Sequence, residues 1–259
     1  MIRQLVISAS LLFILQIVHA GTYVEFSMKG QAANKGGAEM EGSMKAWFQD
    51  GNTRSRFQMN LPPGMDKIPG MPGIGNMVML KLKDQPGKAY MMDESNKTYF
   101  ETPEGAEKDA PEEDFDITII GQEKVNGYNA THLKAVSKIT KSVMDWWVSK
   151  DVAGYQEMKN FRTRQFNTNS LYKWMDAKSV EGFPVKMIMS RGQERFMEMN
   201  LVKAEKMDIP ASQFSLDGYT KREGSPFMPG GMDPEKLKNM SPEDRIKFFQ
   251  ELQKSMQKN

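Results

Sequence analysis

The sequence predicts a mainly β fold, an antiparallel sheet followed by a C-terminal helix, and three observations support this prediction. Two runs of alternating apolar and polar residues flank Asn126-Gly127, and a third run follows at 142–148, as in consecutive antiparallel strands. Asn-Gly accepts the positive φ angles that a tight hairpin turn requires. The same alternation recurs before and after this stretch. We therefore expect most of the chain to extend one sheet.

The N-terminus has the pattern of a signal peptide. Arg3 precedes an apolar run at 5–18, and Val18-His19-Ala20 follows the signal-peptidase pattern of small residues. A retained transmembrane anchor is the alternative, but about 14 apolar residues are fewer than the roughly 20 that span a bilayer. We therefore expect cleavage after Ala20 and export of the mature chain.

The composition limits the kinds of stabilisation and of partner. The chain has no cysteine, so we expect neither a disulfide nor a lipid-anchored cysteine. Its formal net charge is +2, and loss of Arg3 with the signal peptide brings it near +1. This charge gives no electrostatic footprint for nucleic acid. At 39% hydrophobic residues, the fold is expected to be held by buried apolar side chains.

Alternation also predicts where the strands lie and which face each one buries. In the first strand, Val24, Phe26 and Met28 share one face, which we expect to be buried. Asp50-Gly51 predicts a hairpin between the second and third strands. The strands are predicted at 22–29, 40–48, 53–59, 77–83, 89–93, 97–101, on both sides of Asn126-Gly127, and at 142–148, 183–191 and 195–206.

Three segments interrupt the strands. Segment 61–76 has four prolines and four glycines, so it cannot continue a sheet. Its apolar residues allow two interpretations, a loop lying on the barrel or an adaptable flap over a ligand-binding mouth. Segment 102–114 is acidic and is expected to be a solvated connection rather than a metal site. Within 151–173, Tyr155 and Met158 suit a short helix or turn.

The adjacent Trp146 and Trp147 lie in the predicted strand at 142–148. Neighbouring side chains of a strand point to opposite faces, so one ring should pack inward and the other outward. We expect substitution of the inward Trp by Ala to lower the free energy of unfolding by about 3 to 5 kcal/mol, and substitution of the outward Trp to lower it by well under half of that.

Five stretches resemble a known family. They are GSMKAWFQDGNTR at 42–54, IIGQEKVNGYNATHLKAV at 119–136, MDWWVSKDV at 144–152, EGFPVKMIM at 181–189 and EKMDIPASQFSLDGY at 205–219. In this order they resemble an exported bacterial family catalogued as domain of unknown function forty-four-twelve, related in plan to the LolA/LolB-like lipoprotein carriers. The resemblance implies an open, unclosed antiparallel β-barrel of about eleven strands around an apolar cavity, in the periplasm. It carries over no site residue and no substrate.

Few features favour an enzyme. His132 is the only histidine expected to remain after cleavage, and the chain has no cysteine, which excludes thiol nucleophiles and sites that need two imidazoles. We expect His132 on a strand surface. No carboxylate pair has an apolar frame, and segment 70–75 lacks the Lys-Ser or Lys-Thr of a phosphate loop. We therefore expect no catalysis and no cofactor.

Methionine is unusually frequent, with 23 residues in the chain. Because thioethers suit Cu(I), the methionines within 65–77 and 228–232 make Cu(I) binding a minor alternative. Most of the others alternate along predicted strands, as at Met187 and Met189, where core packing explains them. A metal site is therefore not the main prediction.

The C-terminal end predicts a separate helix. Ser241 suits an N-cap and Pro242 the first helical position. Apolar residues recur at helical spacing, at Ile246, Phe249, Leu252 and Met256. Such a face needs an apolar partner, which could be the barrel itself, an envelope protein or a membrane surface.

Together these features predict a signal peptide at 1–20, an open barrel at 21–219, a flexible linker at 220–234 and an amphipathic helix at 235–259. We expect an exported protein that holds a lipid, an acylated protein or another apolar ligand in its concave face. The alternative is an envelope structural protein whose barrel is plugged. The predicted lining and flap residues are Val24, Phe26, Phe48, Met65, Ile68, Met71, Met79 and Trp146.

Overall fold

The computed structural model describes residues 20–31, 39–60, 76–103, 114–159, 169–192 and 194–223. These residues form many strands and few helices. The strands are β1 (Gly21–Gln31), β2 (Glu39–Gln49), β3 (Asn52–Met59), β4 (Asn76–Lys81), β5 (Lys88–Asp93), β6 (Thr98–Pro103), β7 (Phe115–Val125), β8 (Tyr128–Ser137), β9 (Ser142–Ser149), β10 (Phe183–Arg191), β11 (Glu194–Met207) and β12 (Thr220–Arg222). The helices are α1 (Tyr155–Met158), α2 (Asn169–Ala177) and the 3₁₀ helix η4 (Ala211–Phe214).

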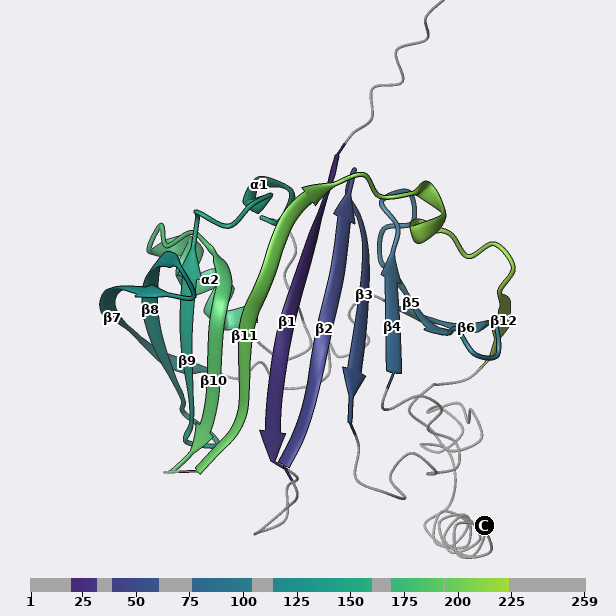
Figure 1. The fold of residues 1–259 in the computed structure, drawn as a ribbon. Helices are drawn as coiled ribbons and strands as arrows, with labels where there is room; N and C mark the ends of the chain where they lie inside the picture. Colours follow the sequence, from purple (N-terminus) through teal and green to yellow (C-terminus); the bar gives the residue numbers. More distant parts are fainter. Residues whose placement is uncertain are drawn as a thin grey trace, which may run out of the picture.

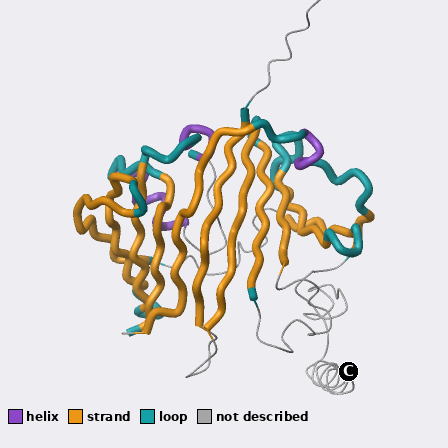
Figure 2. The backbone as a smooth tube through the Cα atoms, viewed as in Figure 1, coloured by secondary structure: helices purple, strands orange, loops and turns teal. Residues whose placement is uncertain are grey.

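All these strands belong to one sheet that does not close. The strand order is β12-β6-β5-β4-β3-β2-β1-β11-β10-β9-β8-β7, and Figure 1 shows both ends of the sheet turning to the side on which α1 and α2 lie. Figure 2 shows how far strands outweigh helices. The mainly β class and the unclosed sheet are therefore confirmed. The predicted C-terminal helix lies outside the described residues, as do the signal peptide and the segment at 61–75.

The hairpin turns follow the sequence closely. Asn126 and Gly127 have φ angles of 51° and 86°, and Asp50 and Gly51 have φ angles of 52° and 84°. Two positive φ angles in a two-residue loop are the geometry for which Asn-Gly and Asp-Gly are favoured. These turns join β7 to β8 and β2 to β3 in antiparallel pairs.

The twelfth strand differs from the sequence prediction, in which the chain leaves the sheet after Tyr219. Instead Thr220 to Arg222 pair in parallel with Thr98 to Phe100 of β6. The N–H of Thr220 donates to the carbonyl of Lys97 at 2.9 Å. The sheet thus extends three residues into the predicted linker. Without β12, the edge of β6 would leave backbone groups unpaired.

The sheet has a core on each of its faces. On the face that carries α1 and α2, a large apolar cluster joins strand residues to Tyr155, Met158, Leu171 and Met175 of the two helices. On the opposite face, Val78, Leu80, Tyr90 and Met92 pack with Phe214, Leu216 and Tyr219. The segment that follows β11 therefore covers the outer face of β4 and β5, whereas the helices occupy the inner, concave face.

Candidate functional site

Methionine side chains form rows across the inner face of the sheet. Residues directly opposite each other in antiparallel strands share a face, so the strand pairing defines each row. One row runs through Met144, Met189, Met197, Gly30 and Met40. The next runs through Met187, Met199, Met28, Gly42 and Met59. Two neighbouring rows add Met44 with Met77, and Met79 with Met91.

The first two rows lie toward the end of the sheet at which β1 reaches Gln31, whereas the row of Met79 and Met91 continues to Val24, nearer the other end. Helix α1 lies at the other end, where Thr22 donates to Glu157 and where Gly154 lies against Thr22. We name this set the methionine face. It comprises Met28, Met40, Met44, Met59, Met77, Met79, Met91, Met144, Met187, Met189, Met197 and Met199.

Glycine allows two strands of this face to pack closely. A Cβ at Gly42 would overlap the carbonyl oxygen of Gln58 and the sulfur of Met59. Gly42 therefore leaves room for Met59 to extend over β2. The methionine row continues across this position without a side chain from β2 itself.

The methionine face is part closed and part accessible. Met28, Met44, Met144, Met187 and Met199 are at most 8% exposed. By contrast Met40, Met59, Met77, Met79, Met189 and Met197 are half-buried. The face therefore offers a rim of flexible apolar side chains beside a packed interior.

The outer face of the same strands is charged. Lys29 Nζ lies 3.1 Å from Glu41 Oε1, directly across β1 and β2. Lys203 Nζ lies 2.7 Å from Glu205 Oε1 along β11. On the same face, a hydrogen bond from Asn200 and the Lys186 ammonium hold the pKa of Glu198 below its usual value. The sheet is thus apolar inside and ion-paired outside.

The structure places the predicted lining residues in two groups. Val24, Phe26, Phe48 and Trp146 are 0 to 3% exposed and belong to the large inner cluster, so they contact other side chains. Met79 is half-buried on the inner face of β4, opposite Met91. The flap residues Met65, Ile68 and Met71 lie outside the described residues, and so do the helix residues Ile246, Phe249, Leu252 and Met256.

Sequence reasoning did not select most of the methionine face as a lining. Met197 and Met199 alternate in the predicted closing hairpin, and their partners Met189 and Met187 alternate in its other strand. The spacing of this hairpin was the available signal. A bulge between Met189 and Ser190 shifts the pairing, which the turn residues alone do not reveal.

His132 lies on the outer surface of β8, as predicted. Its Nε2 is 2.8 Å from Asp145 Oδ1, and its Nδ1 is 3.2 Å from Glu123 Oε1. The ring stacks on Trp147 at 4.2 Å between centroids. Across the described residues, no group of three or more His, Cys, Asp and Glu side chains could hold a metal ion.

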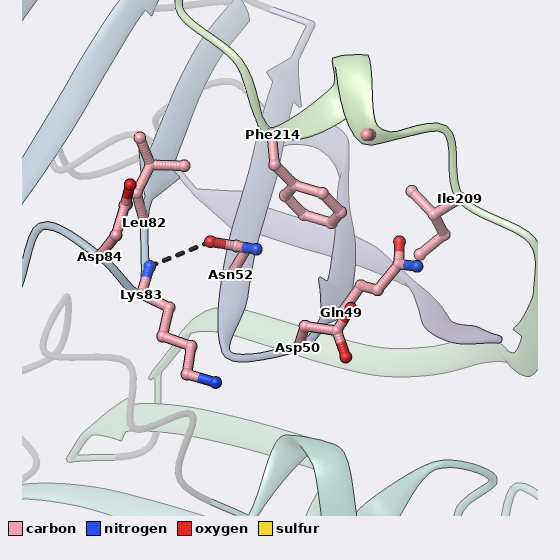
Figure 3. A pocket seen from close by; sticks show the side chains of 9 residues that line it. Gln49, Asp50, Asn52, Leu82, Lys83, Asp84, Ile209 and Phe214 are labelled. Atoms are coloured by element: carbon pink, nitrogen blue, oxygen red, sulfur yellow. Dashed lines mark hydrogen bonds between the residues drawn. The ribbon is translucent and has the colours of Figure 1, made fainter. Parts of the chain in front are cut away.

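A separate pocket of about 660 Å³ lies at the opposite end of the sheet from the first two methionine rows. Figure 3 shows Phe214 and Ile209 on one side, with Asn52 and Lys83 on the other. Asn52 Oδ1 accepts a hydrogen bond from the backbone N–H of Lys83 at 3.0 Å, which links the start of β3 to the turn that follows β4. The remaining lining residues are Gln49, Asp50, Leu82, Asp84 and Ala211. Of the predicted site residues that the structure describes, none lines this pocket.

No helix of the described residues is both long enough and apolar enough to cross a membrane.

Solved structures with a similar fold share little sequence with this chain. An uncharacterized conserved protein from Thermus thermophilus is 8% identical, with a TM-score of 0.43, and the match covers 80% of this chain and 92% of that chain. The Pseudomonas aeruginosa MucA/MucB complex gives 10% identity and a TM-score of 0.40, over 76% of this chain and 56% of that chain. A LolA superfamily protein from Nitrosomonas europaea gives 8% identity and a TM-score of 0.31, over 76% of this chain and 90% of that chain. Similarities at this level carry no argument about function.

Sequence comparison is more decisive. No curated protein matches the chain. A family model described as a domain of unknown function, DUF4412, matches residues 28–218, which is most of the chain and includes the whole methionine face. The chain therefore belongs to the DUF4412 family.

Proposed function

We propose that this protein is an exported, non-enzymatic carrier that holds an apolar chain on its methionine face, in the bacterial periplasm. The single observation that supports this proposal most strongly is the row pattern. Half-buried methionines gather at one end of the concave face, while the outer face of the same strands carries ion pairs. A lipid acyl chain, free or attached to a protein, is the ligand class that this surface suits.

Methionine is well suited to such a ligand. Its unbranched side chain has three rotatable bonds and adapts to irregular apolar shapes. Burial of one methylene group contributes about 0.8 kcal/mol, so ten methylenes in contact would contribute about 8 kcal/mol. The cost of immobilising the ligand reduces this gain. The expected affinity is therefore micromolar or weaker, as a carrier that must release its ligand requires.

Burial favours a second candidate, a structural protein with a plugged interior. Val24 is 0% exposed and Trp146 is 2% exposed, and the ring of Trp146 meets Tyr172 of α2 edge-on at 5.6 Å. The inner face is thus filled in this region. The two candidates differ over the half-buried rim, which a carrier uses and a plugged barrel does not.

The other features of the proposal come from the sequence. They are cleavage after Ala20, the absence of a lipid anchor, and contact with a membrane surface or an envelope partner through the helix at 235–259. Mass spectrometry of the mature protein would test the first two, because the N-terminal residue and any acyl group change the measured mass.

Lipid analysis tests the proposal directly. The protein is purified from its native envelope without detergent exchange, its lipids are extracted, and they are identified by mass spectrometry. A carrier is expected to retain a stoichiometric acyl-chain lipid and to exchange it for a fluorescent fatty acid. The absence of both retained lipid and exchange would favour the plugged structural protein.

A further inference from the structure

Four methionines face one another in a single hairpin of the methionine face. Met187 of β10 lies directly opposite Met199 of β11, and Met189 lies directly opposite Met197. Because side chains two residues apart point to the same side of a strand, the four thioethers share the inner face. We name this set the methionine tetrad.

The strands beside the hairpin add more sulfur. Met144 of β9 lies opposite Met189, and Met28 of β1 lies opposite Met199. The remaining two neighbours are Trp146, which lies opposite Met187, and Gly30, which lies opposite Met197. The side chains next to the tetrad in these rows therefore carry two further thioethers and an indole ring, with no carboxylate or ammonium group among them.

The spacing of the tetrad allows its sulfur atoms to converge. Opposite residues have Cβ atoms about 5 Å apart, and residues two apart along a strand are separated by about 7 Å. The centre of such a rectangle is about 4 Å from each Cβ. A methionine places its sulfur two bonds beyond Cβ, on a side chain with three rotatable bonds, so three or four sulfurs can approach one point above the sheet.

Accessibility is graded across the tetrad. Met187 and Met199 are 4% and 5% exposed, whereas Met189 and Met197 are half-buried. Two donors are therefore held in the packed interior, and two lie at the rim, where an ion can enter. A bulge between Met189 and Ser190 shifts the strand pairing beside these two residues.

Thioethers select soft metal ions. They are neutral at every pH and bind Cu(I) in preference to hard cations. We propose that Met187, Met189, Met197 and Met199 form a thioether site for a soft monovalent metal ion, Cu(I). The site is distinct from the clusters at 65–77 and 228–232 that the sequence suggested, because strand pairing brings these four donors together. Binding adds the ion to the protein with no redox step and no proton exchange.

Methionine packing alone would produce the same rows, so the test must separate sulfur from apolar volume. Leucine keeps the volume and polarity of methionine closely but has no donor atom. The variant Met189→Leu/Met197→Leu therefore removes the accessible half of the tetrad. The variant Met40→Leu/Met59→Leu is the matched control, because these methionines are also half-buried on the same face but lie on β2 and β3.

The mature chain and both variants are titrated with Cu(I) under a competing chelator and with Ag(I) as an air-stable probe. The parent chain and the control are expected to take up one equivalent, and the tetrad variant to bind at least tenfold more weakly with an unchanged melting temperature. Absence of uptake by the parent chain, retained uptake by the tetrad variant, or equal loss in both variants would overturn the proposal. Metal uptake tests this site, whereas lipid retained by the mature chain tests the carrier proposal, so failure of one proposal and failure of the other appear in different measurements.

Discussion

Trp146 and Trp147 lie on opposite faces of β9 and are both largely buried, at 2% and 9% exposure. Trp146 packs inward, and its Nε1 is buried without a hydrogen-bond partner among the described residues. Trp147 faces outward, where its Nε1 donates to Glu123 Oε1 at 2.6 Å and Lys186 Nζ lies 5.3 Å from the ring centroid. Alternation predicted the opposite directions, but not the charged side chains that cover the outer ring.

The two rings should differ in their contribution to stability. Trp146→Ala is expected to lower the free energy of unfolding by about 3 to 5 kcal/mol, because the cavity lies in the closed core. Trp147→Ala is expected to cost about 1 to 2 kcal/mol, for one ring stack and one hydrogen bond. Urea denaturation of both variants measures the difference. Equal losses would show that the contacts of Trp147 on the outer face stabilise the fold as much as those of Trp146 in the core.

Arg54 is another residue that alternation places on the outer face but that the structure buries. It is 6% exposed, pairs with Glu94, and donates from Nη1 to the carbonyl of Gln213 at 3.0 Å. Arg56 pairs with the same carboxylate. Burial alone would raise the pKa of Glu94, but hydrogen bonds and charge from Arg56 and Arg54 outweigh it and lower the pKa below 4.5. The cover comes from η4, far along the chain, so the local pattern could not predict it.

Because of Glu94, the stability of the fold should depend on pH in the acidic range. A carboxylate with a lowered pKa in the folded state stabilises the fold fully above its unfolded pKa, near 4.5, and this stabilisation is lost as the pH falls through the folded value. Glu94→Gln is expected to destabilise the protein at pH 7 by about 1 to 3 kcal/mol, since Arg54 loses its charged partner. The variant should also lose less stability than the parent as the pH falls below about 4.5. An equal loss of stability with falling pH in the parent and in Glu94→Gln would refute this role.

At the scale of elements, the strands were the most predictable part of the fold. The turns at Asp50-Gly51 and Asn126-Gly127, with the alternation on each side, located two hairpins correctly. The short strand β12 was not predicted, because three exposed residues carry no alternation and pair only through the backbone of β6. The helix α2 was not predicted, since its apolar face is defined by the sheet that it covers.

Helix α1 depends on one glycine. Gly154 has a φ angle of 74°, and a Cβ there would overlap Thr22 Oγ1. Gly154→Ala is expected to destabilise the protein by about 2 to 5 kcal/mol, from backbone strain and overpacking together. Gly127→Ala is the matched control, because its φ angle is 86° and nothing lies within 4 Å of its Cβ position. It should cost about 1 to 2 kcal/mol, from strain alone. Thermal melting of both variants compares them.

The helix at 235–259 remains a prediction from sequence, and it should be a detachable cover. Because β12 reaches Arg222, the informative truncation leaves a chain that ends at Glu223. This chain is expected to melt cooperatively and to bind a hydrophobic dye more strongly than the full mature chain. Loss of cooperative melting would make the helix part of the core. Unchanged dye binding would indicate that the apolar face of the helix contacts another partner.

At the scale of the whole molecule, one sheet separates two environments. The inner face combines a packed core with a methionine rim, and the outer face carries ion pairs and a second, smaller core. The sequence predicted the apolar inner face and Met79 within it. It could not predict the methionine rows, because a row joins residues from several strands and depends on their pairing, as with Met28, Met199 and Met187.

The most direct test of the carrier proposal compares the two faces of the sheet. In Met59→Gln/Met77→Gln, two half-buried methionines of the inner rim become polar at nearly constant size. In the control, Lys29→Gln/Lys203→Gln, two exposed cations of the outer face are neutralised, which should cost little stability.

The measurement is the dissociation constant of a fluorescent fatty acid from the mature chain and from each double variant. The carrier proposal predicts saturable binding to the mature chain, at least tenfold weaker binding to the inner-face variant, and unchanged binding to the outer-face control. Equal affinity in all three proteins, or no binding to the mature chain, would contradict it.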